Sequence, residues 1–209
     1  MEQNVRTFRQ RKRILFFWMS APLLGSLLLF TEPVWFDGDV RNEIVRHLGS
    51  FTLLTCIAGR CWAALHIGGQ KNQHLITSGP YARTRNPLYL FSTMGLAGIG
   101  LAAGSVTLGV GFFCFGYLAF GYVIRREEWA LEHFFGSEYH EYTRLVPRFF
   151  PSFSSIVIEQ PGDDQNVYNP RALATTFCHG LVFLLPVPLY GVIQYMQEAK
   201  IIVPILKIY

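Results

Sequence analysis

Residues 106–124 read VTLGVGFFCFGYLAFGYVI, nineteen consecutive residues without a charged side chain. A helix needs roughly 20 predominantly apolar residues to cross the hydrocarbon core of a bilayer. Charged residues make up 15% of the 209-residue chain, whereas soluble domains contain about 25%. Long uncharged runs combined with this low charge predict an all-α integral membrane protein.

Four further apolar runs flank this stretch, so we expect about five transmembrane helices. They span 14–30, 48–67, 88–103 and 172–195. The first run follows basic residues as in a signal peptide, but its length and the lack of a small-residue cleavage motif indicate a retained anchor. Glycines at positions 95, 98 and 100 predict close helix packing and not a nucleotide-binding loop, because no strand precedes them.

Basic residues set the predicted orientation. Thirteen of the 18 lysines and arginines fall in segments 1–13, 68–87 and 125–171. The positive-inside rule places these segments in the cytoplasm, whereas the more acidic segment 31–43 faces outward. We therefore expect a cytoplasmic N-terminus and an integral protein of the bacterial inner membrane.

Composition also excludes some functions. The net charge of +4 is small, and the basic residues gather at the predicted membrane boundaries. Both features argue against a nucleic-acid partner. All four cysteines lie in apolar runs and form no C-x-x-C pair, and the six histidines show no H-E-x-x-H pattern. We therefore predict neither disulfides nor a metal site.

Two polar segments carry the candidate chemistry. The helical hairpin 88–124 returns the chain to the face that it left, so loop 68–87 and segment 125–171 are predicted to form one cytoplasmic cap. Gly79-Pro80 and Asn86-Pro87 keep the loop non-helical. The adjacent Glu127 and Glu128 point about 100° apart on a helix, so one of them faces the protein, and helix geometry leaves the choice open.

The motif Gly79-Pro80-Tyr81-x-x-x-Arg85-Asn86-Pro87-x-Tyr89 resembles the first signature of the isoprenylcysteine carboxyl methyltransferases. These enzymes are grouped with the phospholipid N-methyltransferases. The second signature is similar to Glu127-Glu128-x-x-Leu131-x-x-Phe134-Phe135-Gly136-x-x-Tyr139-x-x-Tyr142, followed by Val146-Pro147-Arg148. The resemblance covers residues 58–151.

This resemblance implies an S-adenosylmethionine-dependent methyltransferase, with the donor under the cytoplasmic cap. The acceptor would be a lipid or a lipid-anchored molecule that enters from the bilayer. Carried over by position, the donor-binding residues are Gln73, His74, Leu75, Ile76, Tyr81, Asn86, Pro87, Leu88, Tyr89 and Glu127. The resemblance favours Glu127 over Glu128, and the predicted catalytic residues are Arg85, Arg126 and Glu127.

Two departures from the family pattern bear on the acceptor. Asn86 replaces a histidine, and Val123 stands where the eukaryotic enzymes carry an arginine for the substrate carboxylate. Arg125 or Arg126 is expected to take over that role. Because basic residues surround the site, we favour a carboxylate or phosphate acceptor. The alternatives are a phospholipid amine N-methyltransferase, a sterol-reductase-like membrane reductase and a non-catalytic scaffold.

Arg60 lies inside the run 48–67. A charged residue within a membrane span either has a binding function or extends its side chain to the membrane interface.

Five regions follow from the spans and motifs: a basic N-terminus (1–13), an N-terminal transmembrane region (14–57), a methyltransferase core (58–151), a cytoplasmic linker or flap (152–171), and a C-terminal transmembrane helix with a tail (172–209).

Overall fold

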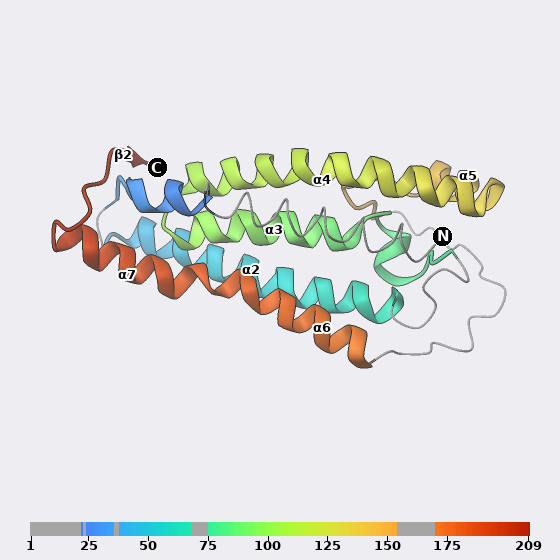
Figure 1. Ribbon diagram of the computed structural model, residues 1–209, viewed down its shortest axis with the longest axis horizontal. Coiled ribbons are helices and arrows are strands. Elements are labelled where there is room, and N and C mark those ends of the chain that lie inside the picture. The colour runs from blue at the N-terminus through green and yellow to red at the C-terminus, as the bar shows by residue number, and fades with distance from the viewer. Residues whose placement is uncertain (1–21, 23, 36–37, 68–74, 154–169) are drawn as a thin grey trace.

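The computed structural model describes residues 22, 24–35, 38–67, 75–153 and 170–209. Long helices lie side by side in an elongated bundle (Figure 1). They are α2 (Val40–Ile67), α3 (Pro87–Ala102), α4 (Val106–Phe135), and the consecutive α6 (Pro170–Leu181) and α7 (Pro186–Glu198). The all-α membrane architecture is thus confirmed.

The described helices differ in whether they are long enough to span a bilayer. Helix α2, helix α4 and the stretch Pro170–Glu198 are long and apolar enough to cross a membrane, whereas α3 has 16 residues. The predicted span 14–30 lies mostly outside the described residues, of which 24–30 are helical. The hairpin of α3 and α4 has the predicted bounds to within a residue, and α4 continues past the predicted span to Phe135.

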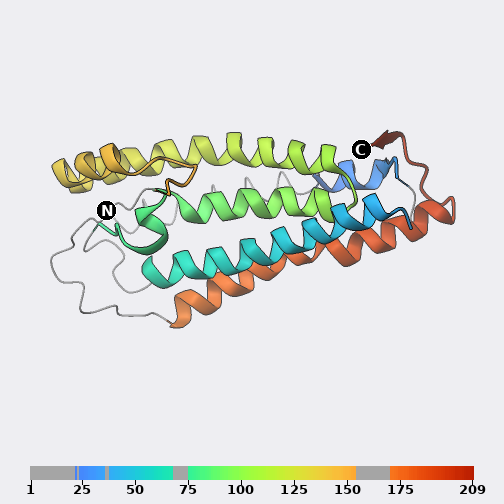
Figure 2. The same cartoon turned by 180° about the vertical axis from the view of Figure 1, so that it is seen from behind.

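Helix α3 lies between α2 and α4, and α6 covers the other side of α2 (Figure 2). Small residues permit the close approach of α3 and α4. A Cβ added at Gly100 would stand 2.4 Å from the backbone nitrogen of Gly109. The glycines of α3 therefore support helix packing, as the sequence predicts.

Helix α2 begins earlier than its apolar run. The predicted outer loop 31–43 ends at Asp39, because the Asp39 carboxylate accepts a hydrogen bond from the Arg41 amide at 2.9 Å. An aspartate at this position satisfies the free amides of a first helical turn. Glu43 in the same turn complements the positive end of the helix dipole.

The predicted C-terminal helix 172–195 is interrupted. A 3₁₀ turn, η2 (Val182–Leu184), separates α6 from α7, which begins at Pro186. Proline has no amide hydrogen and its ring clashes with the preceding turn, so a regular helix cannot continue through it. The apolar run therefore forms two consecutive helices.

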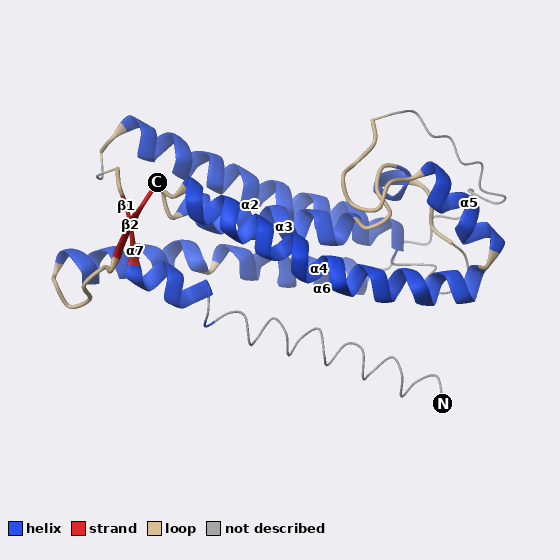
Figure 3. Cartoon of the chain, turned by 90° about the horizontal axis from the view of Figure 1, so that it is seen from above, coloured by secondary structure: helices blue, strands red, loops and turns tan. Residues whose placement is uncertain are grey.

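The two ends of the bundle differ (Figure 3). At one end, called the far end, β1 (Thr31–Pro33) pairs in parallel with β2 (Leu206–Ile208). The Tyr209 carbonyl beyond β2 accepts a hydrogen bond from the Ser105 hydroxyl at 2.7 Å, so the tail also covers the turn between α3 and α4. The other end, called the site end, carries the 3₁₀ turn η1 (Gly79–Ala82) and helix α5 (Ser137–Leu145). Gly136 separates α4 from α5 and caps the C-terminal end of α4.

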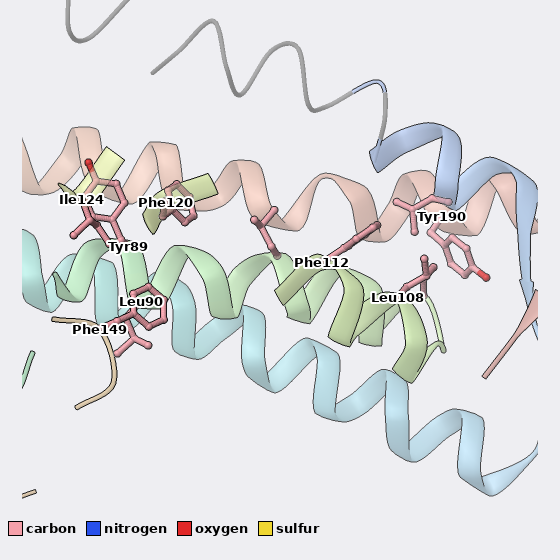
Figure 4. Packing of buried hydrophobic residues seen from close by; sticks show 11 residues of the cluster. Tyr89, Leu90, Leu108, Phe112, Phe120, Ile124, Phe149 and Tyr190 are labelled. Carbon is pink, nitrogen blue, oxygen red and sulfur yellow. The ribbon is translucent and has the colours of Figure 1, made fainter. Parts of the chain in front are cut away.

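A continuous apolar core runs along α3 and α4 and reaches the site end. Its last members there are Tyr89, Leu90, Ile124 and Phe149 (Figure 4). Phe149 comes from the segment that follows α5, so the core joins this segment to the membrane-spanning hairpin. The position of the polar site is thereby tied to the packing of the bundle.

The glycine contact between α3 and α4 is testable with a matched pair of substitutions. Gly100→Ala is expected to destabilise the protein by about 1–3 kcal/mol, because the new methyl group overlaps the α4 backbone. Gly111→Ala meets no atom within 4 Å and is expected to stabilise α4 by roughly 0.5–1 kcal/mol. Thermal unfolding in detergent measures both, and equal effects would contradict the close approach.

Candidate functional site

The two polar segments predicted to meet do so at the site end. Backbone and side-chain hydrogen bonds join residues 81–85 to residues 142–152. They are Arg85 N to Pro147 O at 2.9 Å, Ser152 N to Arg83 O at 2.9 Å, Thr84 Oγ1 to Phe149 O at 2.9 Å, and Tyr142 Oη to Tyr81 O at 2.8 Å. The prolyl loop is therefore held by α5 and the segment after it, which satisfy several of its backbone groups.

Glu128 is the buried acid of the site. Its residue is 6% exposed. One carboxylate oxygen lies 3.3 Å from Arg85 Nη1, and the other accepts a hydrogen bond from Arg148 Nε at 2.8 Å. Two guanidinium groups offset the desolvation of one carboxylate, an arrangement that a buried charge requires.

Asn86 links this cluster to the start of α3. Its side-chain nitrogen Nδ2 donates hydrogen bonds to Glu128 Oε1 at 3.1 Å and to the backbone carbonyl of Arg148 at 3.0 Å. Its own carbonyl accepts hydrogen bonds from the amides of Tyr89 and Leu90 in the first turn of α3, which begins at Pro87. Asparagine at the family's histidine position thus acts as a hydrogen-bond donor that joins the loop, α4 and the segment after α5.

Glu127 lies half-buried one position before Glu128 and faces a different partner. Burial raises the pKa of Tyr81, and the nearby negative charge of Glu127 raises it further. The Tyr81 hydroxyl is buried and has no hydrogen-bond partner among the described residues. A neutral phenol and a carboxylate from the two separate motifs therefore interact electrostatically, and no described residue hydrogen-bonds the phenol.

Two further tyrosines come from α5. Burial raises the pKa of Tyr139 to about 12 and also raises that of Tyr142, against a lowering effect of Arg85 on both. Tyr142 donates to the Tyr81 carbonyl, and both rings pack with Leu75 and Val146. These phenols stay protonated at neutral pH, so they act as hydrogen-bond donors and packing groups and not as bases.

The remaining predicted residues lie in different surroundings. Tyr89 packs on Phe120 with ring centroids 5.2 Å apart. Ile76 and Leu88 are half-buried. Arg126 is exposed on α4, with its guanidinium 5.6 Å from the centre of the Tyr122 ring. Gln73 and His74 lie outside the described residues.

Arg60 contacts its neighbours within the bundle. Its Nη1 donates to the hydroxyl of Ser92 on α3, and its guanidinium lies 5.6 Å from the centre of the Phe183 ring. These contacts place the arginine at the junction of α2, α3 and η2. Arg60 thus helps to join these elements. Its two predicted roles, a binding function or a side chain that extends to the membrane interface, stay predictions.

Comparison with known proteins gives the family. A family model described as phospholipid methyltransferase matches residues 50–138. The cobalt-zinc-cadmium resistance protein CzcN of Cupriavidus metallidurans is 35% identical over 154 residues, which are 74% of this chain and 70% of the relative. The chain belongs to the phospholipid methyltransferase family. The nickel-cobalt-cadmium resistance protein NccN of Alcaligenes xylosoxydans xylosoxydans is 36% identical over 148 residues, which are 71% of this chain and 68% of the relative. No solved structure matches significantly.

The predicted relation to the isoprenylcysteine and phospholipid methyltransferases is thus confirmed. The phospholipid methyltransferase match covers the prolyl loop and both glutamates but ends before Arg148. The sequence motifs include Glu128 and Arg148 without giving either residue a role. The features of the sequence that could have indicated them are the pair of adjacent acids and the motif Val146-Pro147-Arg148.

Removal of the buried charge tests the cluster around Glu128. Glu128→Gln is expected to destabilise the protein by on the order of 3 kcal/mol, because Arg85, 13% exposed, loses its counter-ion. Glu132→Gln, one turn later and half-exposed, is the control and is expected to change stability little. Chemical unfolding in detergent compares the two, and equal midpoints would contradict the ion-pair assignment.

The buried tyrosines predict a pH dependence. Because their folded-state pKa values exceed the ordinary value of about 10, their stabilisation is complete below about pH 10 and declines as the pH rises further. Tyr142→Phe is expected to reduce this alkaline decline and to lower stability at neutral pH by about 1 kcal/mol, through loss of one hydrogen bond. Unfolding midpoints measured against pH test both effects, with the exposed Tyr195→Phe as control. An unchanged decline in Tyr142→Phe would refute the assignment.

Proposed function

We propose that the chain transfers a methyl group from S-adenosylmethionine to the polar head of a lipid or lipid-anchored acceptor. The observation that carries this proposal is the contact of the two motifs, in which Arg85 and Asn86 bind Glu128 at one end of a bundle with helices long enough to span a membrane. Membership of the phospholipid methyltransferase family supports the reaction type. A site at the end of the bundle is accessible both to a water-soluble donor and to a head group in one leaflet.

The residues present fit the donor. S-adenosylmethionine carries a sulfonium and an ammonium group together with a carboxylate, so its site needs an acid and hydrogen-bond donors. Glu127 supplies a half-buried carboxylate, and Tyr81 supplies a buried hydroxyl that no described residue engages. Gln73 and His74 remain proposed donor contacts, since they immediately precede the buried Leu75.

The residues of the cluster hold and orient the reactants. The donor supplies a methyl group on a sulfonium; its carbon–sulfur bond breaks, the electron pair stays on sulfur, and a bond to the acceptor oxygen forms. A carboxylate or phosphate oxygen is already anionic at neutral pH, so Glu127 and Glu128 need not remove a proton. In-line alignment and exclusion of water then provide the catalysis.

The charges at the site favour an anionic acceptor over an amine. Arg85 and Arg148 both face Glu128, and the exposed guanidinium of Arg148 offers N–H donors that suit an anionic oxygen and not a protonated amine. Arg85 therefore keeps its proposed role as a catalytic-site residue. Arg126 lies two positions before Glu128, about 200° around the helix, and so faces away from the cluster.

The proposed setting is the cytoplasmic face of a bacterial inner membrane. Arg83, Arg85, Arg144 and Arg148 all lie at the site end, and basic residues accumulate on the cytoplasmic side of membrane proteins. The proposed core 58–151 contains α3, α4, α5 and the loops that join the two motifs.

The names of the two relatives concern resistance to divalent metals. A methyl group on a carboxylate or phosphate oxygen removes negative charge from a membrane surface. Divalent cations bind oxygen ligands, and anionic head groups attract positive charge. The proposed reaction therefore offers a physical connection to metal tolerance, by lowering the affinity of the membrane surface for cations.

Calorimetric titration of S-adenosylmethionine into protein in detergent and in lipid nanodiscs tests the proposal. Wild type is expected to bind, whereas Glu127→Gln and Tyr81→Phe are each expected to weaken binding roughly tenfold or more, through loss of the carboxylate charge or of the hydroxyl. Glu132→Gln is the matched control and should bind as wild type does. Absence of wild-type binding in both media would overturn the donor assignment.

A further inference from the structure

Arg148 is the most exposed member of the cluster around Glu128. Its side chain is 51% exposed, against 13% for Arg85 and 8% for Glu128. The hydrogen bond to Glu128 comes from Arg148 Nε. The bond positions the guanidinium plane, and among the described residues no hydrogen bond engages its two terminal amino groups. Two parallel N–H groups on one guanidinium match the oxygens of a carboxylate or phosphate.

The cluster presents a positive charge to solvent at Arg148. Arg85 and Arg148 contribute two positive charges, and Glu128 and the half-buried Glu127 contribute two negative charges. Because Arg85 and Glu128 are largely buried, the charge at the exposed edge of this cluster is that of the Arg148 guanidinium.

Aromatic side chains follow directly after Arg148. Phe149 is buried in the core, whereas Phe150 is 58% exposed and Phe153 is 85% exposed. The Phe150 ring stacks on that of Tyr117, with centroids 5.9 Å apart and an interplanar angle of 26°. Tyr117 itself is 41% exposed.

These aromatic residues reach the membrane-spanning part of α4. Tyr117 precedes Glu128 by eleven residues, which is roughly 16 Å along a helix axis. The segment 148–153 thus leads from the polar cluster at the site end to an apolar surface within the depth of the span. We call Arg148, Phe150, Phe153 and Tyr117 the acceptor edge.

We propose that the acceptor edge binds a membrane amphiphile with an anionic head. Arg148 holds the carboxylate or phosphate head through its terminal amino groups, and Phe150, Phe153 and Tyr117 contact the first part of the apolar chain. This assignment rests on the proposed function, because it identifies the amphiphile as the methyl acceptor. It places the specificity-determining arginine after α5 and not at Arg125 or Arg126 on α4.

Binding of a long-chain alkyl phosphate that carries a photoreactive diazirine near its head tests the proposal. The protein is studied in phosphatidylcholine nanodiscs, with empty discs as background and an alkyl phosphocholine of equal length as the zwitterionic comparison. Arg148→Gln is expected to weaken alkyl phosphate binding about tenfold or more. Arg148→Lys is expected to weaken it by less, since lysine keeps the charge but lacks the two parallel N–H groups of the guanidinium. Arg144→Gln removes another exposed arginine from the same end and is expected to bind as wild type does.

The outcomes separate the head, the chain and the proposed function. Unchanged binding in Arg148→Gln, or equal affinity for the phosphocholine, would overturn the role of Arg148. Competition by inorganic phosphate as strong as that by unlabelled alkyl phosphate, or photolabelling outside residues 117 and 149–153, would overturn the apolar contact. Donor titration on the same samples reports the methyltransferase proposal separately, and retained donor binding in Arg148→Gln shows that the variant is folded.

Discussion

A single buried carboxylate organises the site end of this protein. Glu128 belongs to α4, Arg85 and Asn86 belong to the loop before α3, and Arg148 belongs to the segment after α5. Arg85 and Asn86 are adjacent, but both lie far in sequence from Glu128 and Arg148, yet all three partners reach the same two oxygens. A buried charge without such partners would be strongly unfavourable. The ion pairs and hydrogen bonds therefore require the loop, the helix hairpin and the last segment to occupy one arrangement.

The same arrangement separates two environments on adjacent residues. Glu128 is paired with two arginines, whereas the charge of Glu127 acts on the buried Tyr81. The two adjacent acids thus have different partners. The family resemblance favours Glu127 for donor binding, and the surroundings of Glu128 explain why a second acid is present beside it.

Local patterns predicted the helices of this fold well. The uncharged run 106–124 predicted the bilayer-spanning part of α4, whereas the helix itself continues to Phe135. Span arithmetic alone predicted that the two polar segments meet. Span arithmetic did not distinguish the roles of Glu127 and Glu128. Both residues interact with other parts of the protein, and their partners lie far away in sequence. Arg148 was missed for the same reason, since the path of the chain after α5 brings it back to Glu128. The break at Pro186 had a local signal, whereas the pairing of residues 31–33 with 206–208 had none.

The parallel pairing of β1 with β2 has a consequence for the order of assembly. Its partners are about 175 positions apart along the chain, so the far end closes only after every helix between them has been synthesised and inserted. Contacts between distant residues form slowly, because a long loop must close first. The described partners of Glu128 at the site end, by contrast, belong to the loop before α3 and the segment after α5, and both precede α6 and α7 in the chain. The cluster around Glu128 can therefore form during synthesis, before the last two helices and their tail are added.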